Sequence, residues 1–173
     1  MDMAPRKAIL AMLVGVAVSI SSAASAESSR FDWPPTLELD HVLVQTSLYT
    51  RHFNPQPDHT NQQNLISVEL HNPHRWLAGT AWFKNSFDQP TWYFYAGREF
   101  PLWRPSDNVT VRAKLTAGLL RGYKDERQDN IPFNHYGIAP AALPSLGVQW
   151  GRFESDVIVF GTAGMMVTGG IRF

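Results

Sequence analysis

The segment at residues 109–119 constrains the fold of this 173-residue chain more than any other. Apolar residues alternate there with polar or small ones, so that every second side chain faces the same way. One face holds Val109, Val111, Ala113, Leu115, Ala117 and Leu119, and the other holds Thr110, Arg112, Lys114, Thr116 and Gly118. A period of two with one wholly apolar face over about ten residues is typical of a strand that crosses a membrane in a β-barrel.

The same alternation recurs at 66–70 and 165–173 and predicts an all-β chain. Strands are expected at 42–52, 63–71, 75–84, 91–100, 109–120, 135–149, 152–160 and 163–173. Their connections alternate between short turns and longer polar loops, as in outer-membrane barrels. An even strand count also fits, because it is needed when both ends of the chain lie on the periplasmic side. The predicted fold is an eight-stranded antiparallel transmembrane β-barrel over residues 41–173.

A soluble β-sandwich or a lipocalin-like barrel would show the same alternation with its apolar side chains turned inward. Phe173 argues against this alternative, because it ends the chain on the apolar face, as bacterial outer-membrane barrels commonly do. Aromatic residues near the expected strand ends suit interfacial girdles. They are Tyr49, Trp76, Trp82, Trp92, Trp103 and Trp150.

The first 26 residues have the pattern of a cleaved signal peptide. Arg6 and Lys7 precede an apolar run at 8–20, and the small residues 24–26 follow it. The run is too short to span a bilayer, which disfavours the alternative of a membrane anchor. We expect export to the bacterial outer membrane, with a short N-terminal segment at 27–40 before the barrel.

The charge balance and the missing cysteines exclude several classes of function. Fifteen Lys and Arg residues balance fifteen Asp and Glu residues, so no basic excess is available to neutralise nucleic-acid phosphates. The chain contains no cysteine, which excludes disulfide and thiolate chemistry.

The predicted topology brings His52 and Ser86 to the same rim. Strands one and three both run outward; His52 is the last residue of strand one, and Ser86 follows the outer end of strand three. A serine hydroxyl is a poor nucleophile until a base takes its proton, and histidine is the usual base near neutral pH. His59 competes with His52 for this role. Two histidines and Asp58 within one loop resemble metal ligands, but their spacing is irregular and we expect no metal.

Pro140 and Pro144 lie inside the sixth expected strand. Proline cannot donate a hydrogen bond to a neighbouring strand, so two of them predict a local break in pairing. Such a break could let a lipid chain through the wall. The alternative is that residues 135–141 belong to the preceding loop.

Several segments resemble the PagP-type lipid A palmitoyltransferases of the outer membrane. Phe83–Phe87 resembles the family's Phe-Lys-Asp-Ser-Trp, and Leu102–Asp107 contains its Trp-Arg-Pro turn. Leu115–Gly118 resembles Phe-Thr-Ala-Gly, and Ala139–Pro144 resembles Leu-Pro-Val-Leu-Leu-Pro. The resemblance extends over residues 83–148, with Arg172–Phe173 agreeing at the chain's end.

This resemblance implies an eight-stranded barrel with a lipid-filled interior that acts at the outer leaflet without metal, nucleotide or other cofactor. His52 and Ser86 match the family's catalytic His and Ser. The family's catalytic Asp falls at Asn85, which cannot carry the charge that stabilises an imidazolium. Asp58 or Asp88 could replace it, or Asn85 could act as an amide orienter.

Two further positions are carried over as substrate-binding residues. Gly97 matches the position at which the family limits acyl-chain length, and Pro144 matches a proline beside a gap in the barrel wall. The family's second gap has Pro-Gly in strand seven, where this chain has Phe160–Gly161, so the resemblance does not extend to that gap.

The resulting expectation is transfer of a palmitoyl chain from a phospholipid donor to lipid A. Other outer-membrane lipids are expected around a monomer, because a closed barrel needs no partner for its edges. One alternative is a lipid A deacylase or phospholipase, with water as acceptor. The other is a non-catalytic structural or adhesive barrel, whose lumen would be filled by charges such as Glu69, Arg112, Lys114 and Arg172.

Overall fold

The protein is represented by a computed structural model, which describes residues 37–54, 64–122, 134 and 137–173. Residues 32–173 form one compact unit, which contains all the described strands. The predicted signal peptide and residues 27–36 lie outside the described residues. No helix in the described part of the chain is long and apolar enough to cross a lipid bilayer.

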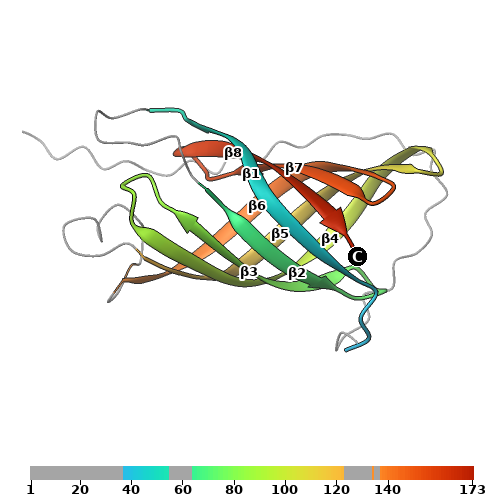
Figure 1. Cartoon of the computed structure of the whole chain (residues 1–173), viewed down its shortest axis with the longest axis horizontal. Coiled ribbons are helices and arrows are strands. Elements are labelled where there is room, and N and C mark those ends of the chain that lie inside the picture. The colour runs from blue at the N-terminus through green and yellow to red at the C-terminus, as the bar shows by residue number, and fades with distance from the viewer. Residues whose placement is uncertain (1–36, 55–63, 123–133, 135–136) are drawn as a thin grey trace, which may run out of the picture. The chain divides into compact units, whose positions relative to one another are not determined.

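The predicted eight-stranded antiparallel barrel is confirmed (Figure 1). The strands pair in chain order, and β1 closes the barrel against β8. They are β1 (His41–His52), β2 (Ile66–His71), β3 (Trp76–Lys84), β4 (Pro90–Ser106), β5 (Val109–Arg121), β6 (Ile138–Trp150), β7 (Phe153–Val159) and β8 (Gly164–Arg172). We call the end at which β1 finishes the His52 end, and the opposite end the far end.

Three strands, β2, β4 and β6, differ by three residues or more from their predicted bounds, and β2 begins only at Ile66. β4 continues past residue 100 to Ser106 and pairs with β5 almost to the Asp107–Asn108 turn. The register shifts between Pro101 and Trp103 and again between Trp103 and Ser106. Such irregular pairing accommodates prolines, which cannot donate to a regular ladder. β6 begins at Ile138, after the turn residue Gly137, and residues 135–136 of the predicted strand lie outside the described residues.

The alternation in β5 sorts its side chains between the lumen and the outer wall. Arg112 and Lys114 point inward and are 2% and 4% exposed, whereas Leu115 and Leu119 point outward and are 50% and 54% exposed. β2 follows the same rule. The apolar face of these strands is therefore the outer wall, which is the reverse of a lipocalin-like barrel.

A network of ion pairs fills the lumen toward the far end. Arg112 pairs with Glu99 at 2.9 Å, with Asp156 at 3.2 Å and with Glu154. Lys114 pairs with Glu69 at 2.8 Å and with Asp156 at 3.4 Å. Buried charges are tolerated only when they are paired in this way. The four residues that the sequence suggested for a charge-filled lumen, Glu69, Arg112, Lys114 and Arg172, all belong to this network. Arg172 joins it by its ion pair with Glu154.

Candidate functional site

The structure brings His52 and Ser86 into direct contact at the His52 end. His52 is the last residue of β1, and Ser86 lies in the turn between β3 and β4. The His52 Nε2 atom and the Ser86 Oγ atom are 2.7 Å apart, which is hydrogen-bond distance. This is the geometry in which an imidazole can accept a hydroxyl proton.

A β-bulge in β1 gives His52 its inward direction. The register against β8 shifts between Ser47 and Tyr49, which leaves Leu48 as an extra residue. Inward positions are odd-numbered before the bulge, as at Gln45, and even-numbered after it, as at Thr50 and His52. Bulges re-aim side chains in this way. The alternation in the sequence gave no sign of it.

Asn85 holds the turn that presents Ser86. Its fully buried side chain accepts hydrogen bonds from the backbone N–H groups of Phe87 at 2.9 Å and Gln89 at 3.0 Å. Its amide group donates to Gln89 Oε1 at 3.2 Å. Asn side chains commonly stabilise turns through such bonds. These contacts shape the loop and do not reach His52.

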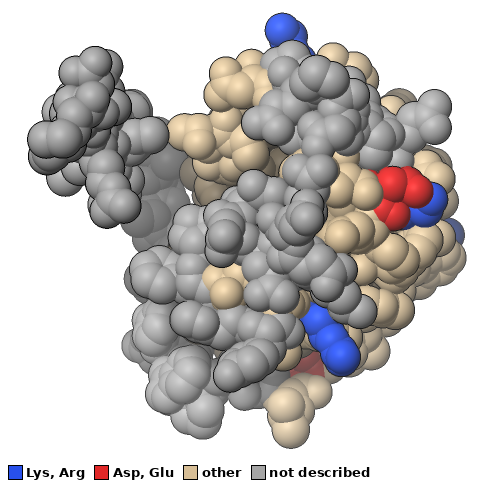
Figure 2. All heavy atoms as spheres, turned by 90° about the vertical axis from the view of Figure 1, so that its left-hand side faces the viewer, with Lys and Arg blue, Asp and Glu red and all other residues tan. Residues whose placement is uncertain are grey.

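Asp88 serves the same turn. Its carboxylate pairs with Lys84 at 2.8 Å, and its backbone adopts a positive φ of 60°, which Asp tolerates better than most residues. The other acid proposed as a partner of His52, Asp58, lies outside the described residues, as does His59. Figure 2 looks onto the His52 end; among the described residues visible there, a few charged groups lie between uncharged ones.

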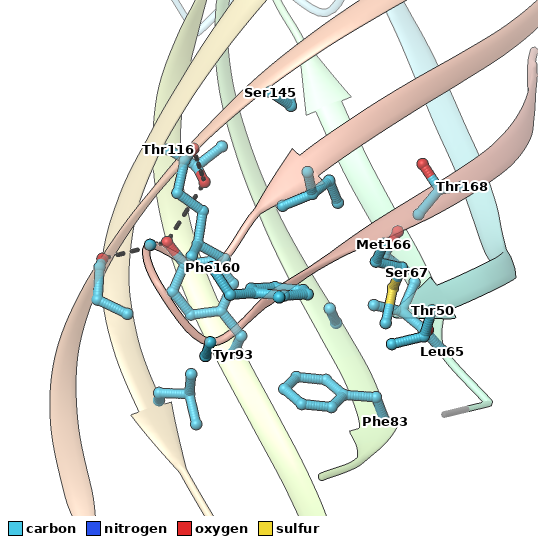
Figure 3. A pocket seen from close by; sticks show the side chains of 18 of the residues that line it. Thr50, Leu65, Ser67, Phe83, Tyr93, Thr116, Ser145, Phe160, Met166 and Thr168 are labelled. Atoms are coloured by element: carbon cyan, nitrogen blue, oxygen red, sulfur yellow. Dashed lines mark hydrogen bonds between the residues drawn. The ribbon is translucent and has the colours of Figure 1, made fainter. Parts of the chain in front are cut away.

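A cavity of about 790 Å³ opens beneath the His52–Ser86 pair, which lies on its lining. Tyr93 and Thr116 lie on one wall, and Leu65, Met166 and Thr168 lie on the opposite wall (Figure 3). The part nearest the pair has a mainly apolar lining. It comprises Leu65, Ala81, Phe83, Tyr93, Leu120, Ala141, Leu143, Phe160 and Met166.

The deeper part of the cavity is polar. The Glu69 carboxylate accepts hydrogen bonds from Tyr95 Oη at 2.9 Å and from Lys114 Nζ at 2.8 Å. The polar lining comprises Gln45, Ser67, Glu69, Lys114, Thr116, Ser145 and Thr168. The Glu69–Lys114 and Lys114–Asp156 ion pairs thus bound the cavity toward the far end.

The barrel wall is incomplete between β6 and β7. β7 pairs with β6 only from Ser145 to Trp150, so residues 138–144 pair with β5 alone. Ala142 is exposed on the outer wall and yet lines the cavity. The cavity therefore reaches the wall at this gap. Pro140 and Pro144 lie in the unpaired segment, as expected of residues that cannot donate to a ladder.

Two hydroxyl groups in the lumen hydrogen-bond to residues 138–144, the segment of β6 that does not pair with β7 and is called the unpaired segment below. Tyr93 Oη donates to the Ala141 carbonyl oxygen at 3.2 Å, and Thr116 Oγ1 donates to the Leu143 carbonyl oxygen at 3.3 Å. Figure 3 shows both bonds as dashed lines, together with the 3.3 Å contact between the two hydroxyls.

The two predicted substrate-binding positions lie outside the cavity lining. A Cβ at Gly97 would collide with the Leu115 carbonyl oxygen and would lie 2.9 Å from Thr116 Cγ2. Glycine at this position therefore permits the close approach of β4 and β5. Pro144 faces outward, beside the gap. Tyr95 lines the cavity instead, on the same face of β4 as Gly97.

Within the described residues, no group of three or more His, Cys, Asp or Glu side chains is arranged to hold a metal ion.

No protein-family model matches the chain, and no curated protein matches it.

Proposed function

We propose that this protein transfers a palmitoyl chain from a phospholipid to lipid A in the outer leaflet of the outer membrane. The observation that carries the proposal is the His52–Ser86 hydrogen bond at the mouth of an apolar cavity. A hydroxyl beside a base can do acyl-transfer chemistry, and an adjoining apolar cavity can hold a fatty acyl chain.

The proposed reaction has two steps. In the first, His52 takes the Ser86 proton while Ser86 Oγ attacks the donor ester carbonyl. The ester bond breaks, and the lysophospholipid leaves with the proton from His52. In the second, His52 takes a proton from a lipid A hydroxyl, which attacks the acyl-serine ester. Ser86 regains its proton, and no oxidant, metal or nucleotide is consumed.

The outer wall supports a place in the membrane. Leu115 and Leu119 of β5, Phe94 of β4 and Ile66 of β2 expose large apolar side chains, and Trp92 stacks on Phe94 with ring centroids 5.9 Å apart. A lipid-facing wall of this kind suits an outer-membrane barrel. We further propose that residues 1–26 are the signal peptide that directs export.

The gap between β6 and β7 supports a route for the acyl chain. Because the cavity reaches the outer wall beside Ala142, an acyl chain can move sideways from the bilayer without its headgroup leaving the interface. The ion pairs beneath the cavity support the other half of the argument, because they stop the chain from passing through the barrel.

The charge network also favours a second candidate, a non-catalytic structural barrel. Arg112 and Lys114 with their acidic partners are what a charge-filled lumen requires. They fill only the far part of the lumen, however, and leave about 790 Å³ open at the His52 end. An open apolar cavity does not contribute to stability, which favours the enzyme.

Purified protein in mixed micelles of phospholipid and lipid A tests the proposal. Acyl transfer predicts equal amounts of lysophospholipid and acylated lipid A, measured by mass spectrometry. Lysophospholipid with free fatty acid would instead identify a phospholipase, and loss of an acyl chain from lipid A would identify a deacylase. A folded barrel that produces none of these would favour the structural role. Ser106→Ala, an exposed serine at the far end of β4, is the matched control for Ser86→Ala.

A further inference from the structure

The Tyr95 side chain lies where the apolar part of the cavity meets its polar part. Its ring stacks on that of Tyr93, with centroids 4.6 Å apart and planes 19° from parallel. Its hydroxyl donates to Glu69 at 2.9 Å, and Glu69 is held in turn by Lys114. Stacking on one side and a hydrogen bond to a buried carboxylate on the other fix the ring in place.

A glycine on the neighbouring strand makes room for this ring. Gly79 is paired with Tyr95 across β3 and β4. A Cβ built on Gly79 would lie 2.8 Å from Tyr95 Cζ and 2.9 Å from Tyr95 Oη. The ring thus rests against the wall at Gly79, and any larger residue there would push it toward the lumen.

An acyl chain has no favourable place beyond Tyr95. The next lining groups are Glu69 and Lys114, both at least 95% buried and bonded to each other. A methylene group cannot replace those hydrogen bonds, and separating the two charges would leave each one buried without its partner. The acyl chain must therefore stop at the tyrosine ring.

We propose that Tyr95 ends the acyl-binding part of the cavity and so selects the length of the acyl chain. This inference rests on the proposed acyl transfer and names its specificity-determining residue. The family resemblance assigns this role to Gly97, which does not line the cavity here.

The test offers purified protein an equimolar mixture of phosphatidylcholines that differ only in the length of their saturated chains. Tyr95→Leu should move the preferred chain to greater length, by about fourfold in preference for each additional methylene that becomes buried. Gly79→Ala should move it to shorter length. Tyr95→Phe keeps the ring and should leave the preferred length unchanged, which controls for loss of the hydroxyl.

A binding measurement separates this inference from the proposed reaction. Affinity for alkyl phosphocholines should rise with chain length and then reach a plateau, and Tyr95→Leu should move that plateau to longer chains. The inference would be overturned if the Tyr95→Leu and Gly79→Ala variants fold and still prefer the same acyl-chain length as the wild-type protein, in transfer or in binding. If the plateau shifts in Tyr95→Leu but the wild-type protein transfers no acyl chain, the proposed acyl transfer is refuted. The inference that Tyr95 ends the acyl-binding part of the cavity would then still hold. Circular dichroism checks that each variant folds.

Discussion

The His52 imidazole and the Ser86 hydroxyl are 2.7 Å apart, although 34 positions separate them in the chain. Each is placed by a local irregularity in an otherwise regular barrel. The bulge at Leu48 turns His52 inward, and the side chain of Asn85 shapes the turn that carries Ser86. Departures from regular structure often mark functional sites, and each member of this pair lies close to one.

Asn85 should matter for the shape of the turn and not for charge. Asn85→Ala removes both acceptor bonds to Phe87 and Gln89 and should destabilise the protein by about 1–3 kcal/mol, with slower acyl transfer. Asn85→Asp keeps an acceptor oxygen for those N–H groups and should retain most of the stability and activity. Urea unfolding in detergent and transfer rates measure the two effects. Full stability of Asn85→Ala with complete loss of activity would show a chemical role instead.

Deletion of Leu48 should be tolerated, because it removes the extra residue that the bulge accommodates. Without this residue Ser47 and Tyr49 can pair continuously with Thr168 and Val167, and His52 stays opposite Gly164. Acyl transfer should therefore persist.

Deletion of Val44 is the matched control for that experiment. The strand absorbs this deletion in one of two ways. It turns Gln45 outward, which breaks its 2.8 Å bond to Asp156, and Leu48 into the polar lumen, or it turns the fully buried Leu43 outward. This variant should unfold at a clearly lower denaturant concentration than the Leu48 deletion. Equal stability of the two deletions would contradict the role assigned to the bulge.

Arg112 should be the cation on which the lumen depends most. Arg112→Leu leaves Glu99, Glu154 and Asp156 without a shared partner and should cost about 3–5 kcal/mol of unfolding free energy. The exposed Arg104 offers a control, because Arg104→Leu should change stability by less than about 0.5 kcal/mol. Thermal and urea unfolding give both values, and similar losses in the two variants would refute a structural network.

The unpaired segment of β6 should loosen when its ties to the lumen are removed. Tyr93→Phe and Thr116→Val each delete a hydrogen bond to this segment and should each cost about 1 kcal/mol. Hydrogen exchange followed by mass spectrometry should show faster exchange at residues 138–144, while residues 145–150, which pair with β7, exchange as before. Uniform acceleration along β6 would contradict local anchoring.

The barrel could be predicted because its cause is local and repeated. Alternation such as that of residues 109–119 follows directly from one apolar and one polar environment on the two faces of a strand. The predicted position of a strand end was less accurate where a proline lies in irregularly paired strands, as Pro101 does in β4. Proline signals broken hydrogen bonding, but it does not tell whether the strand ends or continues through a bulge.

The site could be predicted only in part. Topology alone brought His52 and Ser86 to one rim, whereas the bulge that aims His52 has no signature in the alternation of Leu48 and its neighbours. Tyr93 and Tyr95 can be placed on the face of Gly97 from the sequence, but the role proposed for Tyr95 depends on its contacts with Gly79 and Glu69, which lie on two other strands. Such contacts come from barrel closure, and no single segment encodes them.

Lipid A mass spectrometry tests the central claim most directly. Lipid A is compared between cells that lack the protein and cells that overproduce it, with Ser86→Ala and His52→Ala alongside. We predict that cells with the wild-type protein contain lipid A with one additional palmitoyl group. The amount of this palmitoylated lipid A should fall by at least about a hundredfold in either variant. Unchanged lipid A in every strain, with the wild-type barrel folded in the outer membrane, would contradict the proposed acyl transfer.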